Sequence, residues 1–315
     1  MKISLIIPCY NEESSLAPFY DELNRVTLSM QSYEFEMLFI DDGSTDATLS
    51  VLKEMALKDD RVKYIAFSKN FGKEAAMYAG FCNSTGDYTA VMDADMQDPP
   101  SLLPQMVEIL EKGEYDSVAT RRITRKGEPK IRSAFANMFY KIMGKISNTD
   151  ITSGARDFRL MKRDMVEAIV SMCENNRFSK GIFGWIGFKT YWLPFENVER
   201  VAGQTKWSFS KLFKYSCDGI ISFSNAPLKF ATFSGFIFTI ASIATFLSTF
   251  IYHLCNNQGA YPEWLIVLCV MLLGFGVQFF ALGIVGAYIA KIHSQVKNRP
   301  HYIVAQTNKK DIVKK

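Results

Sequence analysis

Histidine is scarce in this 315-residue chain: there are three, and the first is His253. Residues 1–252 therefore cannot hold a Ser-His-Asp triad, a histidine general base or a histidine-rich metal site. The six cysteines never form a C-x-x-C pair, which argues against a disulfide scaffold or a structural zinc site and favours reduced thiols. Charged residues make up 22% and hydrophobic residues 48%, a balance that excludes a disordered chain, a coiled coil and a collagen-like fibre.

Charge is missing altogether from two long stretches, residues 230–262 and 264–290. A helix needs about 20 apolar residues to cross the hydrocarbon core of a bilayer, so both stretches are long enough. The sequence therefore predicts a transmembrane hairpin with spans at about 230–252 and 264–290, in preference to a buried hairpin of a soluble protein. Gly, Ala and Ser recur in both spans, and small residues of this kind allow helices to approach closely in lipid.

Basic residues are concentrated around these stretches. Residues 200–315 carry 12 basic and 3 acidic side chains, but the link between the two spans has no Lys or Arg. The positive-inside rule then predicts a multi-pass protein of the cell (inner) membrane with both termini in the cytoplasm. Since the excess positive charge belongs to the membrane end, we expect anionic lipid and no nucleic acid as its partner. No signal peptide is expected, because the N-terminal apolar run 3–7 is too short.

Between residue 3 and about residue 120, short apolar runs alternate with segments whose apolar residues have the spacing of a helix. The strand candidates are residues 3–7, 35–40, 62–67, 88–92 and 116–120, and the helix candidates are residues 12–30, 46–58, 72–83 and 101–111. This alternation predicts an α/β fold with a mostly parallel sheet covered on both faces. In such sheets ligands bind beyond the carboxyl ends of the strands.

Acidic residues gather where three of the predicted strands end: Glu12 after the first, Asp42 after the second, and Asp93 and Asp95 after the fourth. Crowded carboxylates repel one another unless a cation neutralises them, and oxygen-only ligands favour Mg²⁺ or Mn²⁺. A polar turn explains a D-x-D sequence equally well, and Asp46 is predicted to be a helix N-cap. The chain has neither a G-x-G-x-x-G fingerprint nor a P-loop.

Four motifs resemble, in this order and spacing, the family 2 glycosyltransferases of GT-A fold: IIPCYNEE, IDDGSTDAT, KNFGKEAAMYAGF and MDADMQDPP. Four later segments are similar to the polyprenyl-phosphate glycosyltransferases, which include bactoprenol glucosyltransferases and dolichyl-phosphate mannose synthase: SGARDFRLM, RFSKGIFGWIGF, RVAGQTKWSFSKL and SFSNAPLK. The resemblance implies a Rossmann-like GT-A catalytic domain in the cytoplasm at residues 1–207. The apolar side chains spaced along residues 208–228 predict an amphipathic interfacial segment. Two transmembrane helices would occupy 229–290, and a basic cytoplasmic tail 291–315.

The same resemblance implies a set of site residues. Those that match a nucleotide-sugar site are Pro8, Tyr10, Glu12, Ile40, Asp42, Asp93, Ala94, Asp95, Arg121, Arg200 and Lys206. Those that match ligands of Mg²⁺ or Mn²⁺ are Asp95, Gln97 and Asp93, and those that match catalytic positions are Asp157, Asp95, Arg200 and Lys206.

Some of these roles have simpler alternatives. Together with the cation, Arg200 and Lys206 would stabilise negative charge on a departing diphosphate. The positive-inside rule alone also explains basic residues at these two positions. Arg121 could be a solvated side chain at a strand end, and Tyr10 a packing aromatic. Asp157 could be a base, a binder of a sugar hydroxyl or an organiser of nearby arginines.

The implied reaction moves one sugar, with inversion, from a nucleotide-diphosphate sugar to polyprenyl (undecaprenyl) phosphate. Gln204-Thr205-Lys206-Trp207 is one residue short of the Q-x-x-R-W motif of processive synthases, and two spans are too few for a polymer channel, so a single transfer fits better. UDP-glucose is the favoured donor, with UDP-N-acetylglucosamine and GDP-mannose as alternatives. A catalytically silent, nucleotide-sugar-binding membrane scaffold is the alternative of another class. The lipid bilayer and a homo-oligomer complete the expected partners.

Overall fold

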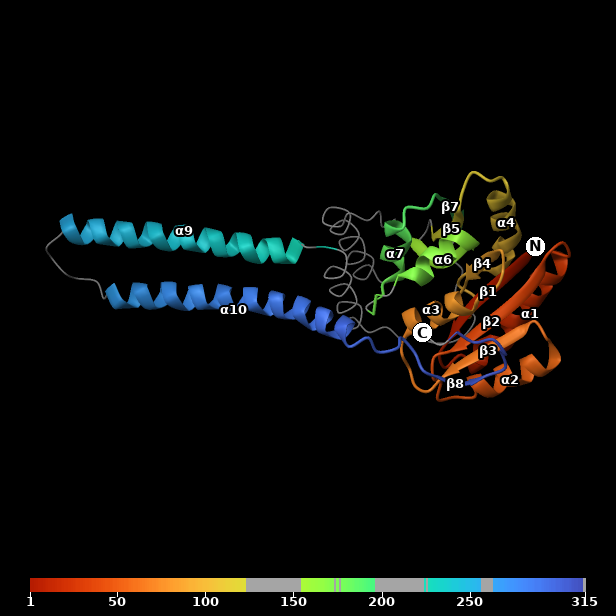
Figure 1. The fold of residues 1–315 in the computed structure, drawn as a ribbon. Coiled ribbons are helices and arrows are strands. Elements are labelled where there is room, and N and C mark those ends of the chain that lie inside the picture. The colour runs from red at the N-terminus through yellow and green to blue at the C-terminus, as the bar shows by residue number, and fades with distance from the viewer. Residues whose placement is uncertain are drawn as a thin grey trace. The chain divides into compact units, whose positions relative to one another are not determined.

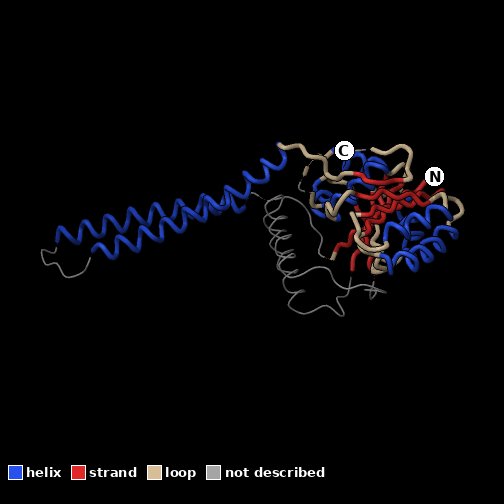
Figure 2. The backbone as a smooth tube through the Cα atoms, turned by 90° about the horizontal axis from the view of Figure 1, so that it is seen from below, coloured by secondary structure: helices blue, strands red, loops and turns tan. Residues whose placement is uncertain are grey.

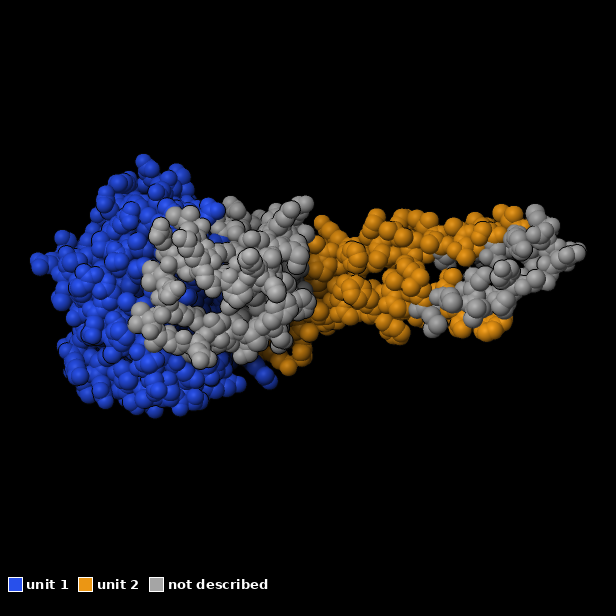
Figure 3. All heavy atoms as spheres, turned by 180° about the vertical axis from the view of Figure 1, so that it is seen from behind, with its two compact units in different colours: residues 1–219, 298–315 blue, residues 220–297 orange. Residues whose placement is uncertain are grey.

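The computed structural model describes residues 1–122, 154–172, 174–175, 177–195, 224, 226–255 and 263–313. Two compact units make up the chain: unit 1 contains Met1–Gly219 and Asn298–Lys315, and unit 2 contains Ile220–Lys297 (Figure 3). Each unit is described by itself below.

Unit 1 is organised around an eight-stranded sheet in the order β7-β5-β6-β4-β1-β2-β3-β8 (Figures 1 and 2). Four neighbouring strands pair in parallel: β1 (Lys2–Cys9), β2 (Glu34–Asp41), β3 (Val62–Phe67) and β4 (Tyr88–Val91). The helices that follow them are α1 (Glu13–Ser29), α2 (Thr48–Lys58), α3 (Lys73–Asn83) and α4 (Leu103–Glu111), the last preceded by the 3₁₀ turn η1 (Pro100–Leu102). The predicted α/β fold is confirmed.

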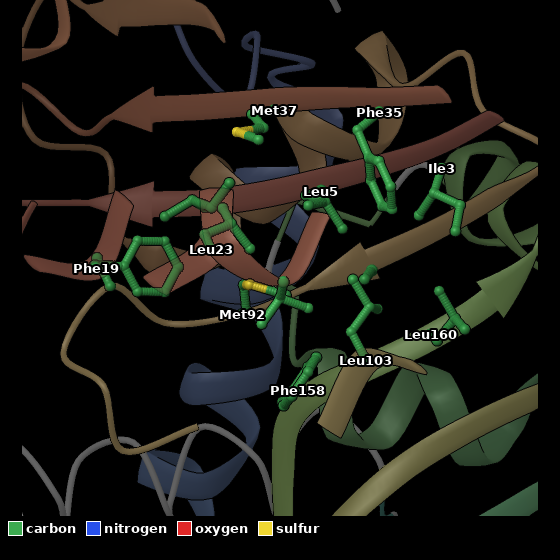
Figure 4. Packing of buried hydrophobic residues seen from close by; sticks show 14 of the residues in the cluster. Ile3, Leu5, Phe19, Leu23, Phe35, Met37, Met92, Leu103, Phe158 and Leu160 are labelled. Atoms are coloured by element: carbon green, nitrogen blue, oxygen red, sulfur yellow. The ribbon is translucent and has the colours of Figure 1, made fainter. Parts of the chain in front are cut away.

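Both faces of the sheet are covered because β1 is apolar on both sides. Its Leu5 joins the core that includes Phe19 and Leu23 of α1 and Leu103 of α4 (Figure 4). Successive side chains of a strand point to opposite faces, so Ile6 meets α3 instead, where a Cβ on Gly80 would lie 2.2 Å from the Ile6 side chain. The near-continuous apolar run of β1 is typical of a parallel strand buried on both faces.

The second half of the sheet contains a strand that runs the other way. Its elements are β5 (Ser117–Arg122), β6 (Ala155–Lys162), α6 (Arg163–Ser171), α7 (Ser179–Trp185) and β7 (Thr190–Phe195). β6 is antiparallel to both β4 and β5. The start of β6 therefore lies at the same edge of the sheet as the ends of β4 and β5.

The last described residues of the chain return to unit 1. β8 (Val304–Thr307) pairs antiparallel with β3, the Tyr302 ring stacks on Phe67 with centroids 4.9 Å apart, and Asn308 bonds to the main chain of Tyr64 and Val62. The sequence predicts a separate basic tail at residues 291–315. The structure differs, because residues 298–313 complete the edge of the sheet in unit 1.

Unit 2 consists of two long helices, α9 (Ala226–Cys255) and α10 (Glu263–Val296). Both are long and apolar enough to cross a membrane, and they contain the predicted spans. Large apolar side chains of both are exposed, such as Phe233 at 63% and Phe279 at 70%, so the described residues do not form the buried hairpin of a soluble protein. The predicted interfacial segment 208–228 lies outside the described residues, except for 224 and 226–228.

The two helices of unit 2 contact each other through aromatic side chains. The Phe230 and Phe280 rings meet edge to face with centroids 6.5 Å apart, and the Tyr288 hydroxyl donates to the Ser224 carbonyl at 2.6 Å. A Cβ added to the glycines of the spans would meet no described atom within 4 Å; these are Gly235, Gly274, Gly276, Gly283 and Gly286. These glycines therefore make no close contact with the described atoms of the other helix, and the expectation that small residues let the spans approach closely stays a prediction.

The attachment of the C-terminal segment includes one buried ion pair and can be tested there. Lys309 Nζ lies 2.6 Å from Glu36 Oε1, and the two side chains are 11% and 7% exposed. Removing one partner of a buried pair costs about 3 kcal/mol or more, and the partly exposed Lys2, whose Nζ lies 3.8 Å from Glu36 Oε2, compensates only part of that loss. Lys309→Ala should lower the free energy of unfolding of unit 1 by about that amount, measured by urea unfolding in detergent at pH 7.

The matched control is Lys310→Ala, one residue further along at an exposed position, which should change stability little. Burial works to raise the pKa of Glu36, but hydrogen bonds from Lys309 and Ser4 and the charge of Lys309 hold it below its ordinary value. The contribution of Glu36 is therefore present at neutral pH and decreases as the pH falls below about 4, where the difference between Lys309→Ala and wild type should shrink. Equal urea midpoints for the two variants at pH 7 would contradict this account.

Candidate functional site

The loops that follow β1 and β2 are held together at the carboxyl edge of the sheet. Asn11 has a φ of 52°, a conformation that asparagine tolerates better than most residues. Its N–H donates to Ser44 Oγ at 2.9 Å, and its side-chain oxygen accepts the N–H of Thr45 at 2.8 Å. The next N–H, that of Glu12, donates to Thr48 Oγ1 at 2.8 Å. These bonds give the edge a fixed shape.

Asp42 fixes the loop that leads into α3. Its carboxylate accepts the N–H of Phe71 at 2.7 Å and that of Gly72 at 2.9 Å. The neighbouring Gly43 has a φ of +66°, and a Cβ there would lie 2.3 Å from the carbonyl carbon of Lys69, so only glycine allows the two loops to approach this closely. Burial raises the pKa of Asp42 to about 6, against the effect of these hydrogen bonds. The start of α3 is thereby set by the end of β2.

Lys73, the first residue of α3, joins two carboxylates from different strands. Its Nζ lies 2.7 Å from Asp93 Oδ1 and 2.9 Å from Oδ2, and 2.6 Å from Asp157 Oδ2. Burial alone would lower the pKa of Lys73, but the charges of Asp157 and Asp93 hold it above its ordinary value. Burial likewise works to raise the pKa of Asp157, yet the charges of Lys73 and Lys180 hold it well below its usual range.

A second ion pair connects the loop after β4 with β6. Asp98 is fully buried, and Arg156 Nε donates to its Oδ1 at 2.7 Å. Within the described part of the chain, Asp98 Oδ2 and Arg156 Nη2 have no hydrogen-bond partner. Burial raises the pKa of Asp98 to about 6, against the charge of Arg156. Because Arg156 immediately precedes Asp157, this pair fixes residues 93–98 relative to Asp157.

Glu74, the neighbour of Lys73, ties α3 to α7. Its carboxylate accepts the N–H of Ser179 at 3.0 and 3.1 Å as well as the Ser179 hydroxyl. Ser179 is the first residue of α7, where the helix dipole favours a negative charge. Two consecutive residues at the start of α3 thus connect the loop after β4, β6 and α7.

The predicted site residues of the carboxyl edge fall into three groups. Asp93 and Asp157 meet through Lys73, whereas Asp95 accepts the N–H of Gln97 at 3.1 Å within its own turn. Arg121 is exposed at the end of β5, opposite Ala155 of β6. Those residues lie at one edge, as the family resemblance implies.

Other predicted residues occupy different surroundings. Ile40 is fully buried in the sheet, so any contact with a nucleotide at this position is through its main chain. Pro8 pairs with Ile40 in the register of β1 and β2, and Ala94 is buried. Tyr10 and Glu12 are partly buried beside them. Arg200 and Lys206 lie outside the described residues.

The donor atoms present can be compared with those that a divalent cation requires. No group of three or more His, Cys, Asp or Glu side chains in the described ranges is arranged to hold a metal ion. Asp93 and Asp95 offer two carboxylates, and Asp93 already holds Lys73. Mg²⁺ is commonly bound by one or two carboxylates together with water and substrate phosphates. The residues therefore fit an ion that binds together with a diphosphate, and they do not form an all-protein cage.

Sequence reasoning assigned no role to Lys73, Glu74, Asp98 or Arg156. All four stand inside motifs that carried the family resemblance. The available signal was the position of Lys73 and Glu74 in the first helical turn after a strand, at the edge where ligands bind.

Comparisons with known proteins identify the family of the chain. Residues 4–170 match the family described as glycosyl transferase family 2. The chain is 39% identical over 315 residues to a prophage bactoprenol glucosyl transferase homolog of Escherichia coli, covering 98% of this chain and 100% of that one. It is 38% identical over 315 residues to the bactoprenol glucosyl transferase of Shigella phage SfII, covering 98% and 99%.

Among solved structures, a mannosyltransferase of Pyrobaculum calidifontis in complex with GDP-Man and Mn²⁺ is 17% identical, with 91% of this chain and 75% of that chain covered and a TM-score of 0.46. That likeness is too distant to bear on the site.

The buried position of Asp42 predicts a pH dependence. Since its pKa is raised from 3.8 to about 6, the folded state binds the proton more tightly than the unfolded chain does. The free energy of unfolding of the wild type should therefore rise relative to Asp42→Asn as the pH falls from 7 to 4. The expected rise is about 2 kcal/mol, at roughly 1.4 kcal/mol per pKa unit and with the unfolded carboxyl already partly protonated at pH 4, and denaturant unfolding at each pH measures it.

Asp60→Asn, at an exposed position on the surface, controls for the simple loss of one carboxylate. If the stability difference between the wild type and Asp42→Asn stayed constant over this pH range, the buried environment assigned to Asp42 would be wrong.

Proposed function

Because this chain belongs to glycosyl transferase family 2 and is a glycosyltransferase, we propose that it transfers one glucosyl residue from UDP-glucose to undecaprenyl phosphate. The transfer inverts the anomeric centre and takes place at the cytoplasmic face of the membrane. The observation that carries the proposal is a carboxylate-lined sheet edge in a chain that also contains two exposed apolar helices.

Two observations support a lipid acceptor and a glucosyl donor. The relatives named bactoprenol glucosyl transferases are 38–39% identical over almost the entire chain, including both apolar helices. The exposed apolar side chains of α9 and α10 suit a bilayer, the medium in which a polyprenyl tail lies. A phosphate head on such a tail would reach the protein from the membrane surface.

The topology of unit 1 supports a cytoplasmic location for both ends of the hairpin. β3 precedes α9 in the chain and β8 follows α10, yet these two strands pair in one sheet. If both helices cross the membrane, both flanking segments must then lie on one side of it. The positive-inside rule assigns that side to the cytoplasm.

The residues of the carboxyl edge suggest how the donor is held. Asp93 and Asp95 would bind Mg²⁺ or Mn²⁺ together with the diphosphate, and the ion would supply Lewis-acid stabilisation of the leaving group. Arg121, at the same edge, offers a planar guanidinium that suits a phosphate. We also assign to Arg200 and Lys206 the stabilisation of negative charge on the leaving diphosphate, as the family resemblance implies.

The acceptor needs no strong base. A phosphate monoester with a second pKa of about 6 is mostly ionised at neutral pH, and its oxyanion is the nucleophile. Asp157 is ionised and paired with Lys73, so it is a poor proton acceptor. We therefore assign Asp157 an electrostatic role that keeps Lys73 in place, and no role as a general base.

The proposed reaction is tested by a donor panel. Membranes that contain the chain are incubated with undecaprenyl phosphate, Mg²⁺ or Mn²⁺, and labelled UDP-glucose, UDP-N-acetylglucosamine or GDP-mannose. Label should enter the extracted lipid from UDP-glucose, and excess EDTA should abolish this transfer. Asp95→Asn is the matched inactive control, with an expected loss of at least about 10²-fold.

Different failures of the panel have different meanings. Transfer from another donor alone would correct the sugar, whereas no transfer from any donor would favour a silent nucleotide-sugar-binding scaffold. Full activity in excess EDTA would contradict a metal bound at Asp93 and Asp95.

A pH–rate profile of Asp157→Asn tests the role of Asp157. We expect kcat to fall by about 10²-fold, the order expected when one electrostatic stabiliser is removed, with no recovery as the pH rises. A missing base would instead be bypassed at alkaline pH, where the acceptor is fully ionised. The profile covers roughly pH 5.5–8.5 with a short-chain polyprenyl phosphate. Recovery of most of the activity at the alkaline end would make Asp157 a base.

A further inference from the structure

Lys73 forms an ion pair with Asp93, a carboxylate that the proposed donor site requires. Its ammonium contacts both oxygens of Asp93 and one oxygen of Asp157. Asp93 follows β4, and Asp157 lies in β6, which runs antiparallel to β4. The side chains of Asp93 and Asp157 are 24% and 19% exposed. Two carboxylates that are largely removed from water and share one ammonium need that positive charge, because their mutual repulsion is weakly screened there.

Two other basic residues act on this pair. Arg156 is held by Asp98 at 2.7 Å, and the charges of Lys180 and Arg156 both help to lower the pKa of Asp157. Lys73 contacts both carboxylates directly. Its position is fixed in turn by the bonds of Asp42 to Phe71 and Gly72 at the start of α3.

One ammonium balances only one of the two carboxylates. Taken alone, the Asp93–Lys73–Asp157 group has a net negative charge, which attracts a divalent cation, and the charges of Lys180 and Arg156 reduce that attraction at Asp157. An ion that binds to Asp93 must nevertheless displace Lys73 from the same oxygens. Without a nucleotide, the ion gains few other ligands from the described residues, because no three acidic side chains among them are arranged to hold it. With a diphosphate present, phosphate oxygens add both ligands and negative charge.

We propose that Lys73 is a positioning residue that serves as the resident counter-cation of Asp93 and Asp157 and competes with the divalent cation for Asp93 until a nucleotide diphosphate arrives. On arrival of the ion and the diphosphate, Lys73 leaves Asp93 and stays on Asp157. The ion and the donor then bind as one unit, and the edge is never left with two unbalanced carboxylates. This inference rests on the proposed function, since it takes the donor to be a nucleotide-diphosphate sugar.

The test measures Mn²⁺ binding to the full chain in detergent without any nucleotide, from the EPR signal of free Mn²⁺. Lys73→Met keeps the length of the side chain but removes its charge, and it should bind Mn²⁺ about tenfold or more tighter than the wild type, within the usual range of coupling between two ligands. Lys73→Arg keeps the charge and should stay near the wild type. The control Lys69→Met removes an exposed lysine of the preceding loop and should change nothing.

Addition of UDP should reduce the difference between Lys73→Met and wild type to less than about threefold, because the diphosphate lets the ion displace Lys73 in the wild type as well. Equal or weaker Mn²⁺ binding by Lys73→Met without UDP would overturn the proposal. So would tighter binding by Lys69→Met of the same size, since that would be a general effect of charge.

A second measurement, of thermal unfolding, covers the case in which Lys73→Met is less stable than the wild type. Mn²⁺ without nucleotide should raise the thermal unfolding temperature of Lys73→Met and leave that of the wild type unchanged, because a ligand stabilises the state that binds it. A Lys73→Met protein that Mn²⁺ does not stabilise would show that Lys73 has only a structural role. The donor panel on the wild type separates the two proposals: no sugar transfer with a tenfold gain in Mn²⁺ affinity would reject the function and keep the role of Lys73.

Discussion

The ion pairs of Lys73 with Asp93 and Asp157 constrain everything at the carboxyl edge of the sheet. Two partly buried carboxylates are held 2.6–2.9 Å from one ammonium, and removal of that ammonium would leave their mutual repulsion uncompensated. The surrounding structure keeps that ammonium in place. Asp42 binds the main chain just before α3, and Gly43 allows the two loops to approach. The same contacts that stabilise the fold therefore set the geometry in which a donor diphosphate would bind.

In the sequence, the two apolar helices interrupt unit 1 and do not simply follow it. β3 precedes the two apolar helices in the sequence and β8 follows them, yet the two strands pair with each other. Lys309, which follows β8, forms an ion pair with Glu36 of β2. A shortened chain that ends before α9 would lose an edge strand and a buried counter-ion together. This connection explains why the hairpin and the glycosyltransferase unit are best studied in one full-length protein.

Much of the fold could be predicted from the sequence because β1 to β4 and α1 to α4 have clear apolar periodicity. β6 could not, since its eight residues include four charged ones, Arg156, Asp157, Arg159 and Lys162. Its burial depends on partners that only the fold supplies: the Arg159 guanidinium lies 4.5 Å from the centroid of the Phe183 ring and also over Trp192. β8, with four residues, is too short for a pattern. The meeting of Lys73 and Asp157, 84 residues apart, requires the antiparallel direction of β6, which no local signal specifies.

A pair of structures of the full-length protein, one without ligand and one with UDP and Mn²⁺, tests the central claim most directly. The measurement is the distance from Lys73 Nζ to the nearest oxygen of Asp93, which is 2.7 Å here. With UDP and Mn²⁺ bound, this distance should exceed the ~4 Å limit of an ion pair, while the contact of Lys73 with Asp157 persists. An unchanged Lys73–Asp93 contact in the complex, or Mn²⁺ bound away from Asp93, would contradict the account.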